Sequence, residues 1–411
     1  MLITPFGRDI GIGFAGSVDT DTGQRTTTLA SQVQSISEMF VTSVYNPDIK
    51  EAELVVEKSG LGAELKGGKL TAVDSISAFL STPMEIVIVS DMDAAVANEV
   101  TLAAFAAGKH VVNLNAVSEA ALGVYYKAKA ADAGVIYSVG AGDEPAATLE
   151  LVEFCEKLNL DIVCAGKGKN NPLNLHAIPD DYFEYGKEKN LNPQSIASFV
   201  DGSKTMLEMS LLSNATGWGI DKPGMHGPKV NVNELHTTYI PKADGGILST
   251  TPVIDYGIGN IAPGVFVVFT TEQQSIIDEL LYLKMQGGPY FHLYKPYHLG
   301  NIEAPLSIHS ILRDKRPSLV IKDKFVTMVC AKAKKNLEAG EIIDTSGGYC
   351  MYGFAVPAAD AAAQNLAPMA LVEKSTVTRD LAADELITMD YIKVDESRGL
   401  LKCWNEQKAM L

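Results

Sequence analysis

The sequence predicts an α/β protein in which a Rossmann-type doubly wound parallel sheet is followed by an α+β central substrate domain and a small β-rich C-terminal domain. Two observations lead to this prediction. Short β-rich apolar runs alternate with helical stretches over residues 9–161, which is typical of βαβ units. Beyond this segment the rhythm changes, and helical and β-like runs are mixed. We therefore expect domains at 1–160, 161–325 and 326–411.

The individual elements follow from hydrophobic periodicity. In the first domain, strands are expected at 9–16, 39–45, 85–90, 110–115 and 135–140. Helices are expected at 27–38, 94–107 and 118–133, and the last two are followed by Gly108 and Gly134, which can act as left-handed caps. A helix at 146–158 and a strand at 161–166 lead into the central domain. There we expect helices at 203–214 and 271–284 and a strand at 264–269.

The C-terminal part contains a faint internal repeat. KKNLEAGEIID at 334–344 returns as TRDLAADELIT at 378–388, with shared Leu, Ala, Glu and Ile positions. Each copy is interpreted as a small β-rich unit, and a chance match is the alternative. Such units resemble the half-repeats of SAF-type β-clip domains.

Composition limits the partners. The chain has 50 acidic and 34 basic residues, a net charge of −16 and no Lys/Arg-rich run, which disfavours nucleic acids and anionic membranes. No apolar run reaches the roughly 18 to 20 residues of a membrane span. The five cysteines lack CxxC spacing, which argues against a disulfide framework and against structural zinc. We expect a cytoplasmic protein without nucleic-acid or membrane partners.

The first βα turn departs from the GxGxxG pattern that lets a backbone approach a pyrophosphate. Candidate cofactor-binding residues are Gly13, Gly16, Gly23, Arg25 and Thr26, together with Asn46 after the second strand. Either this modified loop still binds NADPH or NADH, or the scaffold has lost nucleotide binding. The preference between the two cofactors stays open, because Asn46 is neither the acidic residue that favours NAD nor the basic one that favours NADP.

The segment GAGDEP at 140–145 follows a strand, at the edge where open α/β sheets bind ligands. Its Asp143 and Glu144 are candidates for proton transfer and for binding a divalent cation. The alternative is that they only place negative charge in the first turn of the following helix.

A second candidate segment is GKGKNNPLN at 166–174, which we interpret as a flexible loop. Its lysines and amides, Lys167, Lys169, Asn170 and Asn171, suit an anionic, hydroxylated ligand, although an ordinary exposed turn has the same composition. Further candidates for a polar substrate pocket are Lys204, Lys229, Lys295 and His298.

The motifs GAGDEP, GKGKNNPLN, DGSKTMLEM, GMHGPK, IAPGVFVVF and GPYFHLYKPYHL together identify a resemblance from about residue 108 to the C-terminus. The chain is similar to the type II, homoserine-dehydrogenase-like form of 1-deoxy-D-xylulose 5-phosphate reductoisomerase. The resemblance implies an NAD(P)-binding domain, a central catalytic domain that also forms a homodimer, and a SAF-like C-terminal domain. It also implies rearrangement of 1-deoxy-D-xylulose 5-phosphate and reduction by NADPH, with a divalent metal, Mg or Mn.

The resemblance implies roles for the candidate residues. Asp143 and Glu144 would hold the metal, and Lys169 would donate a proton to developing alkoxide charge. The phosphate would be bound by Lys167, Lys204, Lys229 and Lys295, and the hydroxyls by Asn170, Asn171 and His298. Lys229 and Lys295 stand where arginine is expected, so the substrate can differ.

Three functions follow from these observations. The first is an NAD(P)H-dependent reductoisomerase of a sugar phosphate. The second is a simple homoserine-dehydrogenase-like dehydrogenase of a four- or five-carbon polyhydroxy compound. The third is a non-catalytic metabolite-binding protein, which the altered glycine loop favours.

Overall fold

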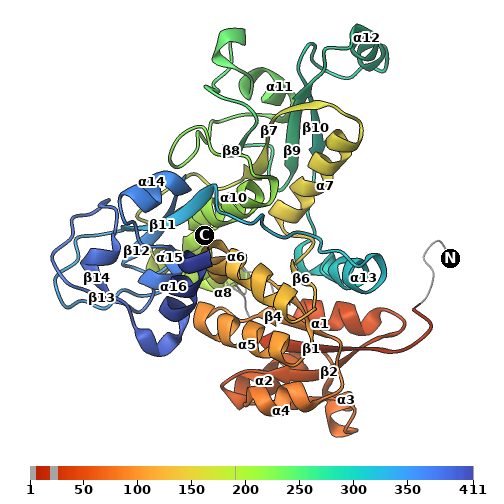
Figure 1. Cartoon of the computed structure of the whole chain (residues 1–411), viewed down its shortest axis with the longest axis vertical. Coiled ribbons are helices and arrows are strands. Elements are labelled where there is room, and N and C mark those ends of the chain that lie inside the picture. The colour runs from red at the N-terminus through yellow and green to blue at the C-terminus, as the bar shows by residue number, and fades with distance from the viewer. Residues whose placement is uncertain (1–5, 19–25, 190, 411) are drawn as a thin grey trace.

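A six-stranded parallel sheet forms the N-terminal part of the chain, seen in red and orange in Figure 1. The computed structural model describes residues 6–18, 26–189 and 191–410. The strands are β1 (Ile10–Gly16), β2 (Met39–Tyr45), β3 (Thr71–Val73), β4 (Ile86–Ser90), β5 (His110–Asn113) and β6 (Tyr137–Val139). Their order is β3-β2-β1-β4-β5-β6 and all pairs are parallel. The sheet is therefore doubly wound, and the predicted fold class is confirmed.

Helices connect these strands. They are α1 (Thr26–Ser35), α2 (Ile49–Lys58), α3 (Gly62–Lys66), α4 (Ile76–Ser81), α5 (Ala94–Ala106) and α6 (Ala116–Asp132). The predicted caps Gly108 and Gly134 adopt left-handed φ angles of 68° and 67°. Two predicted ends are corrected. The helix after β1 ends at Ser35 rather than at residue 38. The strand β5 ends at Asn113 rather than at residue 115, because Asn115 accepts the backbone N–H of Ser118 and caps α6.

The central part is built on a four-stranded mixed sheet with the order β10-β9-β7-β8. Its strands are β7 (Asp161–Lys169), β8 (Val253–Ile258), β9 (Val265–Thr270) and β10 (Phe291–Lys295). Two helices, α7 (Glu144–Lys157) and α10 (Ser203–Thr216), pack on this sheet. The remaining helices are α8 (Phe183–Lys189), α9 (Pro193–Val200), α11 (Leu235–Thr238), α12 (Gln274–Tyr282) and α13 (Pro305–His309). The interpretation of 166–174 as a flexible loop is wrong at its start, because β7 continues to Lys169.

The C-terminal part, blue in Figure 1, pairs β11 (Thr327–Ala333) with β12 (Met351–Pro357), and β13 (Thr376–Val377) with β14 (Ile392–Lys393). Three helices accompany these strands: α14 (Ala358–Ala363), α15 (Met369–Val372) and α16 (Leu400–Met410). The domain boundaries at 160 and 325 stay a prediction. Within the described ranges, no helix combines the length and the apolar character needed to cross a bilayer.

The two copies of the faint repeat pair with each other. Leu337 and Leu381 are equivalent in the repeat, and each donates its backbone N–H to the other's carbonyl, at 3.0 and 2.9 Å. The ion pair of Lys335 with Glu341 in the first copy recurs as Arg379 with Glu385 in the second. The repeat therefore reflects a local two-fold arrangement rather than chance.

Candidate functional site

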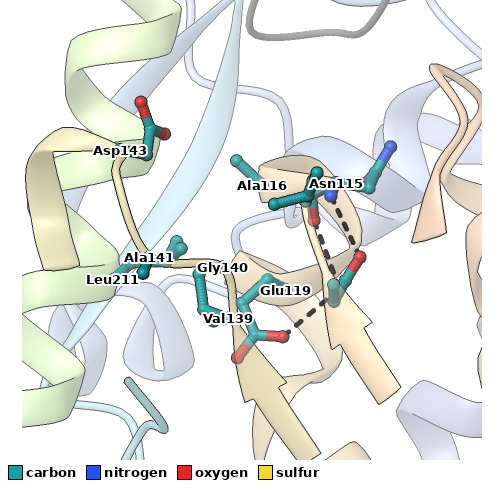
Figure 2. A pocket seen from close by; sticks show the side chains of 10 residues that line it. Asn115, Ala116, Glu119, Val139, Gly140, Ala141, Asp143 and Leu211 are labelled. Carbon is teal, nitrogen blue, oxygen red and sulfur yellow. Dashed lines mark hydrogen bonds between the residues drawn. The ribbon is translucent and has the colours of Figure 1, made fainter. Parts of the chain in front are cut away.

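The segment GAGDEP connects the carboxyl end of β6 to the N-terminus of α7. Gly142 has a φ of 93°, and its carbonyl accepts the backbone N–H of Gly300 at 2.9 Å, so a side chain at this position would collide with the chain. Figure 2 shows Asp143 beyond Gly140 and Ala141, beside the helix that carries Leu211. Asp143 occupies the N-cap position and Glu144 the first turn of α7, as the alternative interpretation of this segment also expected.

Glu144 belongs to a buried ionic cluster, which we define as Asp143, Glu144, Lys167, Lys204 and Glu208. Lys167 on β7 places its Nζ 2.7 Å from Glu144 Oε1 and also bonds Glu208. Lys204 and Glu208 lie one helical turn apart on α10, with Nζ and Oε1 2.9 Å apart. Lys204 Nζ also lies 3.6 Å from Glu144 Oε2 and 3.8 Å from Asp143 Oδ1. Three elements, α7, β7 and α10, thus contribute to one charged cluster.

Three carboxyl groups and two ammonium groups share the cluster, and the pKa values of the carboxyl groups shift in different directions. Burial alone would raise the pKa of Glu144, but Lys167 and Lys204 outweigh it and hold that pKa well below its usual range. Burial raises the pKa of Asp143 well above its usual range, against the opposing effect of Lys204. Burial, together with the charge of Glu144, also raises the pKa of Glu208, against the opposing effects of Lys167 and Lys204.

This donor set does not fit the divalent metal predicted at Asp143 and Glu144. Ligand-type atoms of Asp143, Glu144 and His298 do lie within 4.8 Å of one another. However, Lys167 Nζ lies 2.7 Å from Glu144 Oε1, and Lys204 Nζ lies 3.6 Å from Glu144 Oε2 and 3.8 Å from Asp143 Oδ1, so ammonium groups already face both carboxyl groups. The lysines supply the positive charge that a metal would bring. We derive no step through a metal.

Chelation provides a test of this arrangement. Turnover is expected to be unchanged after dialysis against EDTA, because the cations of the cluster are side chains. Activity would be measured with and without added Mg²⁺ or Mn²⁺, with recovery of folded protein as the control. A loss that either ion restores would contradict the assignment.

A cavity of about 190 Å³ adjoins the cluster, and we call it the substrate cavity. Lys167, Lys169, Asn170, Asn171, Lys204 and His298 are among its lining residues. Lys169 Nζ donates to the carbonyl of Phe199, at the C-terminal end of α9, over 2.6 Å. Burial, together with the charge of Lys167, lowers the pKa of Lys169 to about 8. Lys169 can therefore exchange a proton near neutral pH.

Two predicted substrate residues lie outside this cavity. Lys229 is exposed, and its backbone forms a bridge with Ile258. Lys295 Nζ lies 3.0 Å from Glu150 Oε2 and 3.8 Å from Glu303 Oε2, so carboxylates neutralise its charge. Glu208, which the sequence interpretation missed, is fully buried within the cluster. Its spacing of four residues from Lys204 on a helix was the available signal.

The predicted cofactor residues occupy different positions at the first sheet. Gly13 lies inside β1, where a side chain would meet Met84 and Phe79, so this glycine serves packing rather than a phosphate loop. Gly16 ends β1 against Ser90, whose Oγ lies 2.8 Å from Thr26 Oγ1 at the start of α1. Gly23 and Arg25 lie outside the described residues.

Polar side chains continue along the same sheet edge. Asn46 Nδ2 donates to Asp91 Oδ2 over 3.1 Å, and burial raises the pKa of Asp91. The close approach of Gly16 to Ser90 and the polar residues after β2 and β4 fit a dinucleotide bound across this edge.

A small hollow of about 20 Å³, enough for one water molecule, lies between the sheet edge and Asp143. Glu119, drawn in Figure 2, lines it and bonds Tyr137. Burial raises the pKa of Glu119 to about 7. Asn115 uses its side-chain amide to bond the carbonyls of Asp91 and Met92. These polar groups are engaged in holding the edge of the sheet next to the ionic cluster.

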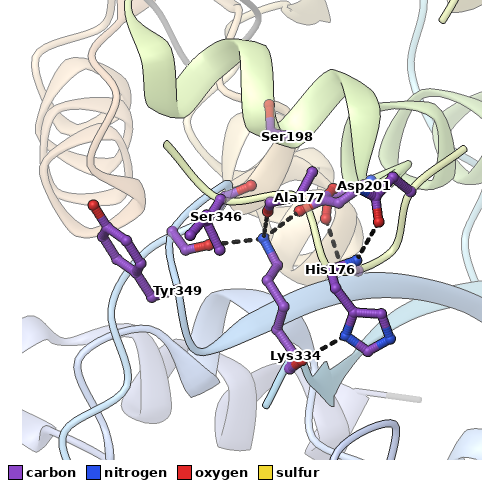
Figure 3. Close-up of polar contacts among 12 residues, drawn as sticks. His176, Ala177, Ser198, Asp201, Lys334, Ser346 and Tyr349 are labelled. Carbon is purple, nitrogen blue, oxygen red and sulfur yellow. Dashed lines mark hydrogen bonds and ion pairs between the residues drawn. The ribbon is translucent and has the colours of Figure 1, made fainter. Parts of the chain in front are cut away.

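The C-terminal part also supports the site. Lys334 directly follows β11. Figure 3 shows its side chain reaching Asp201, which lies between α9 and α10. Lys334 Nζ donates to Asp201 Oδ2 at 2.8 Å and to the carbonyls of Ala177 and Gly348 at 2.7 Å each. All three ammonium donors are used. Asp201 in turn accepts the backbone N–H of Ser203, the first residue of α10.

Residues 142–304 match the family described as the catalytic domain of oxidoreductase DRL. This segment contains the whole ionic cluster and Lys169 of the substrate cavity. The match agrees with the predicted oxidoreductase class, and the dependence on NAD(P) stays a prediction. No curated protein matches the chain.

Solved structures similar to the chain include several dehydrogenases. A probable dehydrogenase from Thermotoga maritima is 13% identical, with 75% of this chain and 90% of that chain covered and a TM-score of 0.44. A myo-inositol dehydrogenase from Corynebacterium glutamicum is 12% identical, with 75% and 90% covered and a TM-score of 0.42. The WlbA dehydrogenase from Bordetella pertussis, solved with NADH and UDP-GlcNAcA, is 12% identical, with 66% and 67% covered and a TM-score of 0.36.

Proposed function

We propose that the protein catalyses NAD(P)H-dependent reduction of a small phosphorylated or polyhydroxylated carbonyl compound in the substrate cavity. The observation that carries the proposal is Lys169, a lysine of pKa about 8 in the wall of a cavity that further lysines and two amides also line. A cavity of about 190 Å³ suits a small compound, since cavities of about 150 Å³ hold benzene.

Each group has a separate task in this reaction. A nicotinamide, when bound, supplies the hydride, and Gly16, Thr26 and Asn46 are the described residues that would hold the dinucleotide. Lys169 donates its Nζ proton to the carbonyl oxygen as alkoxide charge develops there, which yields the alcohol. The neutral amine then regains a proton from solvent. Asn170 and Asn171 bond the hydroxyls of the substrate, and Lys204, which also lines the cavity, borders the substrate from the ionic cluster.

A rearranging reductoisomerase acting on 1-deoxy-D-xylulose 5-phosphate is the second candidate. The observation that favours it is the pair of ammonium groups, Lys167 and Lys204, at one wall of the cavity, because such a rearrangement requires neighbouring oxygens to be held together. The simple reduction requires only the hydride and proton steps. We therefore place the reduction first.

The deciding experiment has two readouts. Calorimetry with NADH and with NADPH is expected to show binding of at least one cofactor. Turnover would then be followed by loss of reduced-nicotinamide absorbance with four- and five-carbon hydroxycarbonyl compounds and with 1-deoxy-D-xylulose 5-phosphate. A branched carbon skeleton in the product identifies the reductoisomerase, and an unchanged skeleton identifies the reductase. Absence of binding for both cofactors would favour a metabolite-binding protein and overturn the proposal.

A further inference from the structure

Another hollow lies in the C-terminal part, and we call it the C-terminal hollow; residues of β11, α14 and α16 line it. Figure 1 shows where these three elements lie. Its volume is about 350 Å³, which exceeds that of the substrate cavity. The walls are largely apolar and include Phe325, Met328, Leu366 and Trp404. Phe325 and Trp404 are only 8% and 9% exposed. The hollow is therefore a recess suited to a small molecule rather than a flat face suited to another protein.

The charged residues that line this hollow are both lysines. Lys324 and Lys408 are exposed, and neither forms an ion pair with a residue in the described part of the chain. Such a pair stands out in a chain with a net charge of −16. The nearby carboxylate of Asp390 bonds the amide of Asn365 at the rim, and Asp390 is not itself a lining residue.

We propose that the C-terminal hollow binds a small molecule with an apolar body and a single terminal anionic group, such as a medium-chain carboxylate. The apolar body gains by leaving water, and the anion stays at the exposed mouth beside Lys324 and Lys408. An engineered apolar cavity of about 150 Å³ already binds benzene, so this larger hollow accommodates a longer chain.

The hollow adjoins the anchor of α10. Asn214 Oδ1, near the end of α10, accepts the backbone N–H groups of Val326 at 2.8 Å and Thr327 at 3.0 Å. These two residues lie between the lining residues Phe325 and Met328. Because α10 also carries Lys204 and Glu208, a ligand in the hollow contacts the segment that fixes this helix. The binding proposal itself does not depend on the reaction assigned to the substrate cavity.

Trp404 provides a direct readout of binding. The chain has two tryptophans, so a Trp218→Phe variant leaves Trp404 as the single reporter. Titration with octanoate is expected to change its fluorescence in a saturable way. Octylamine and 1-octanol, which have the same chain without the anion, are expected to bind at least about tenfold more weakly. Equal responses to all three probes, or no response to octanoate, would overturn the proposal.

Two variants of α14 locate the ligand. Both alanines are exposed, but Ala362 lines the hollow and Ala363, the next residue on the same helix, does not. Ala362→Leu is expected to weaken octanoate binding at least about fivefold because it narrows the hollow, while Ala363→Leu retains it. Equal binding by the two variants would place the ligand elsewhere.

The lysines are tested by a double variant, Lys324→Met with Lys408→Met. It is expected to bind octanoate no better than octanol, and undiminished octanoate binding would contradict the ionic part of the proposal. Sedimentation at several protein concentrations completes the test. Association that buries the hollow, reported by a concentration-dependent Trp404 signal without probe, would assign the hollow to a second copy of the chain instead.

Discussion

Replacing Lys169 by methionine is expected to lower kcat by about two to four orders of magnitude, the usual contribution of a positioned proton donor. Methionine keeps the length and the apolar part of the side chain but removes the ammonium group that donates to the alkoxide. Nucleotide binding is expected to persist, because Lys169 lies in the substrate cavity and not at the edge of the first sheet. Initial rates and calorimetry on the same preparation separate these two properties.

The pH profile gives the matching control. The pKa of Lys169 is lowered to about 8, so the reactive ammonium form is present below that pH, and the rate of reduction is expected to fall about tenfold per unit above it. A Lys169→Arg variant keeps the charge but cannot release a proton in this range. If Lys169→Met turned over at the parental rate, or if Lys169→Arg kept both the rate and the alkaline limb, Lys169 would not be the proton donor.

The parallel sheet was predictable because most of its strands are short apolar runs that alternate with helices. The segment between Asn46 and Glu85 was not predicted. Its elements α3, β3 and α4 are short, whereas α2 is an amphipathic helix of ten residues that the sequence interpretation missed. Their sequence does contain capping residues. Asp48 accepts the N–H of Lys50, and Ser75 accepts the N–H of Ala78. Capping residues define helix ends, but they do not reveal that the three residues of β3, between α3 and α4, form the edge strand of the sheet.

The strand β7 shows why composition misled the prediction for its second half. Gly, Lys and Asn are typical of loops, yet Gly166 and Gly168 lie where a side chain would meet the backbone of Asp255 and of Ile261. Alternate residues of a strand face the same side, so Lys167 and Lys169 point together toward the ionic cluster and the cavity. The chemistry assigned to this segment stays a prediction, and the packing that makes its first half a strand is not apparent from the sequence.

The sequence indicated which residue types form the candidate site, but not which of these residues the fold brings close together. GAGDEP and GKGKNN supply residues that the fold brings together across α7 and β7. Lys229 and Lys295 were chosen for charge and sequence context, and the fold places one in solvent and pairs the other with Glu150. The predicted metal does not fit for the same reason, because only the structure shows Lys167 bonded to Glu144 and Lys204 facing it at 3.6 Å.

Replacing Lys334 by methionine is expected to destabilise the protein by about 3–5 kcal/mol, because it leaves the carboxylate of Asp201 buried without its partner. Both side chains of this pair are at most 2% exposed. Urea denaturation would measure the change in free energy of unfolding. The neighbouring Lys335→Met variant is the matched control, since Lys335 forms an exposed ion pair with Glu341 and its loss is expected to cost no more than about 1 kcal/mol.

A double variant separates the missing charge from the missing packing. Asp201→Asn combined with Lys334→Met removes both charges and is expected to recover most of the lost stability. Asp201 lies two residues after Phe199, whose carbonyl holds Lys169, so the alkaline limb of the pH profile is expected to move to lower pH when the carboxylate is neutralised. If Lys334→Met and Lys335→Met unfold at the same urea concentration, the buried pair of Lys334 and Asp201 does not stabilise the protein as expected.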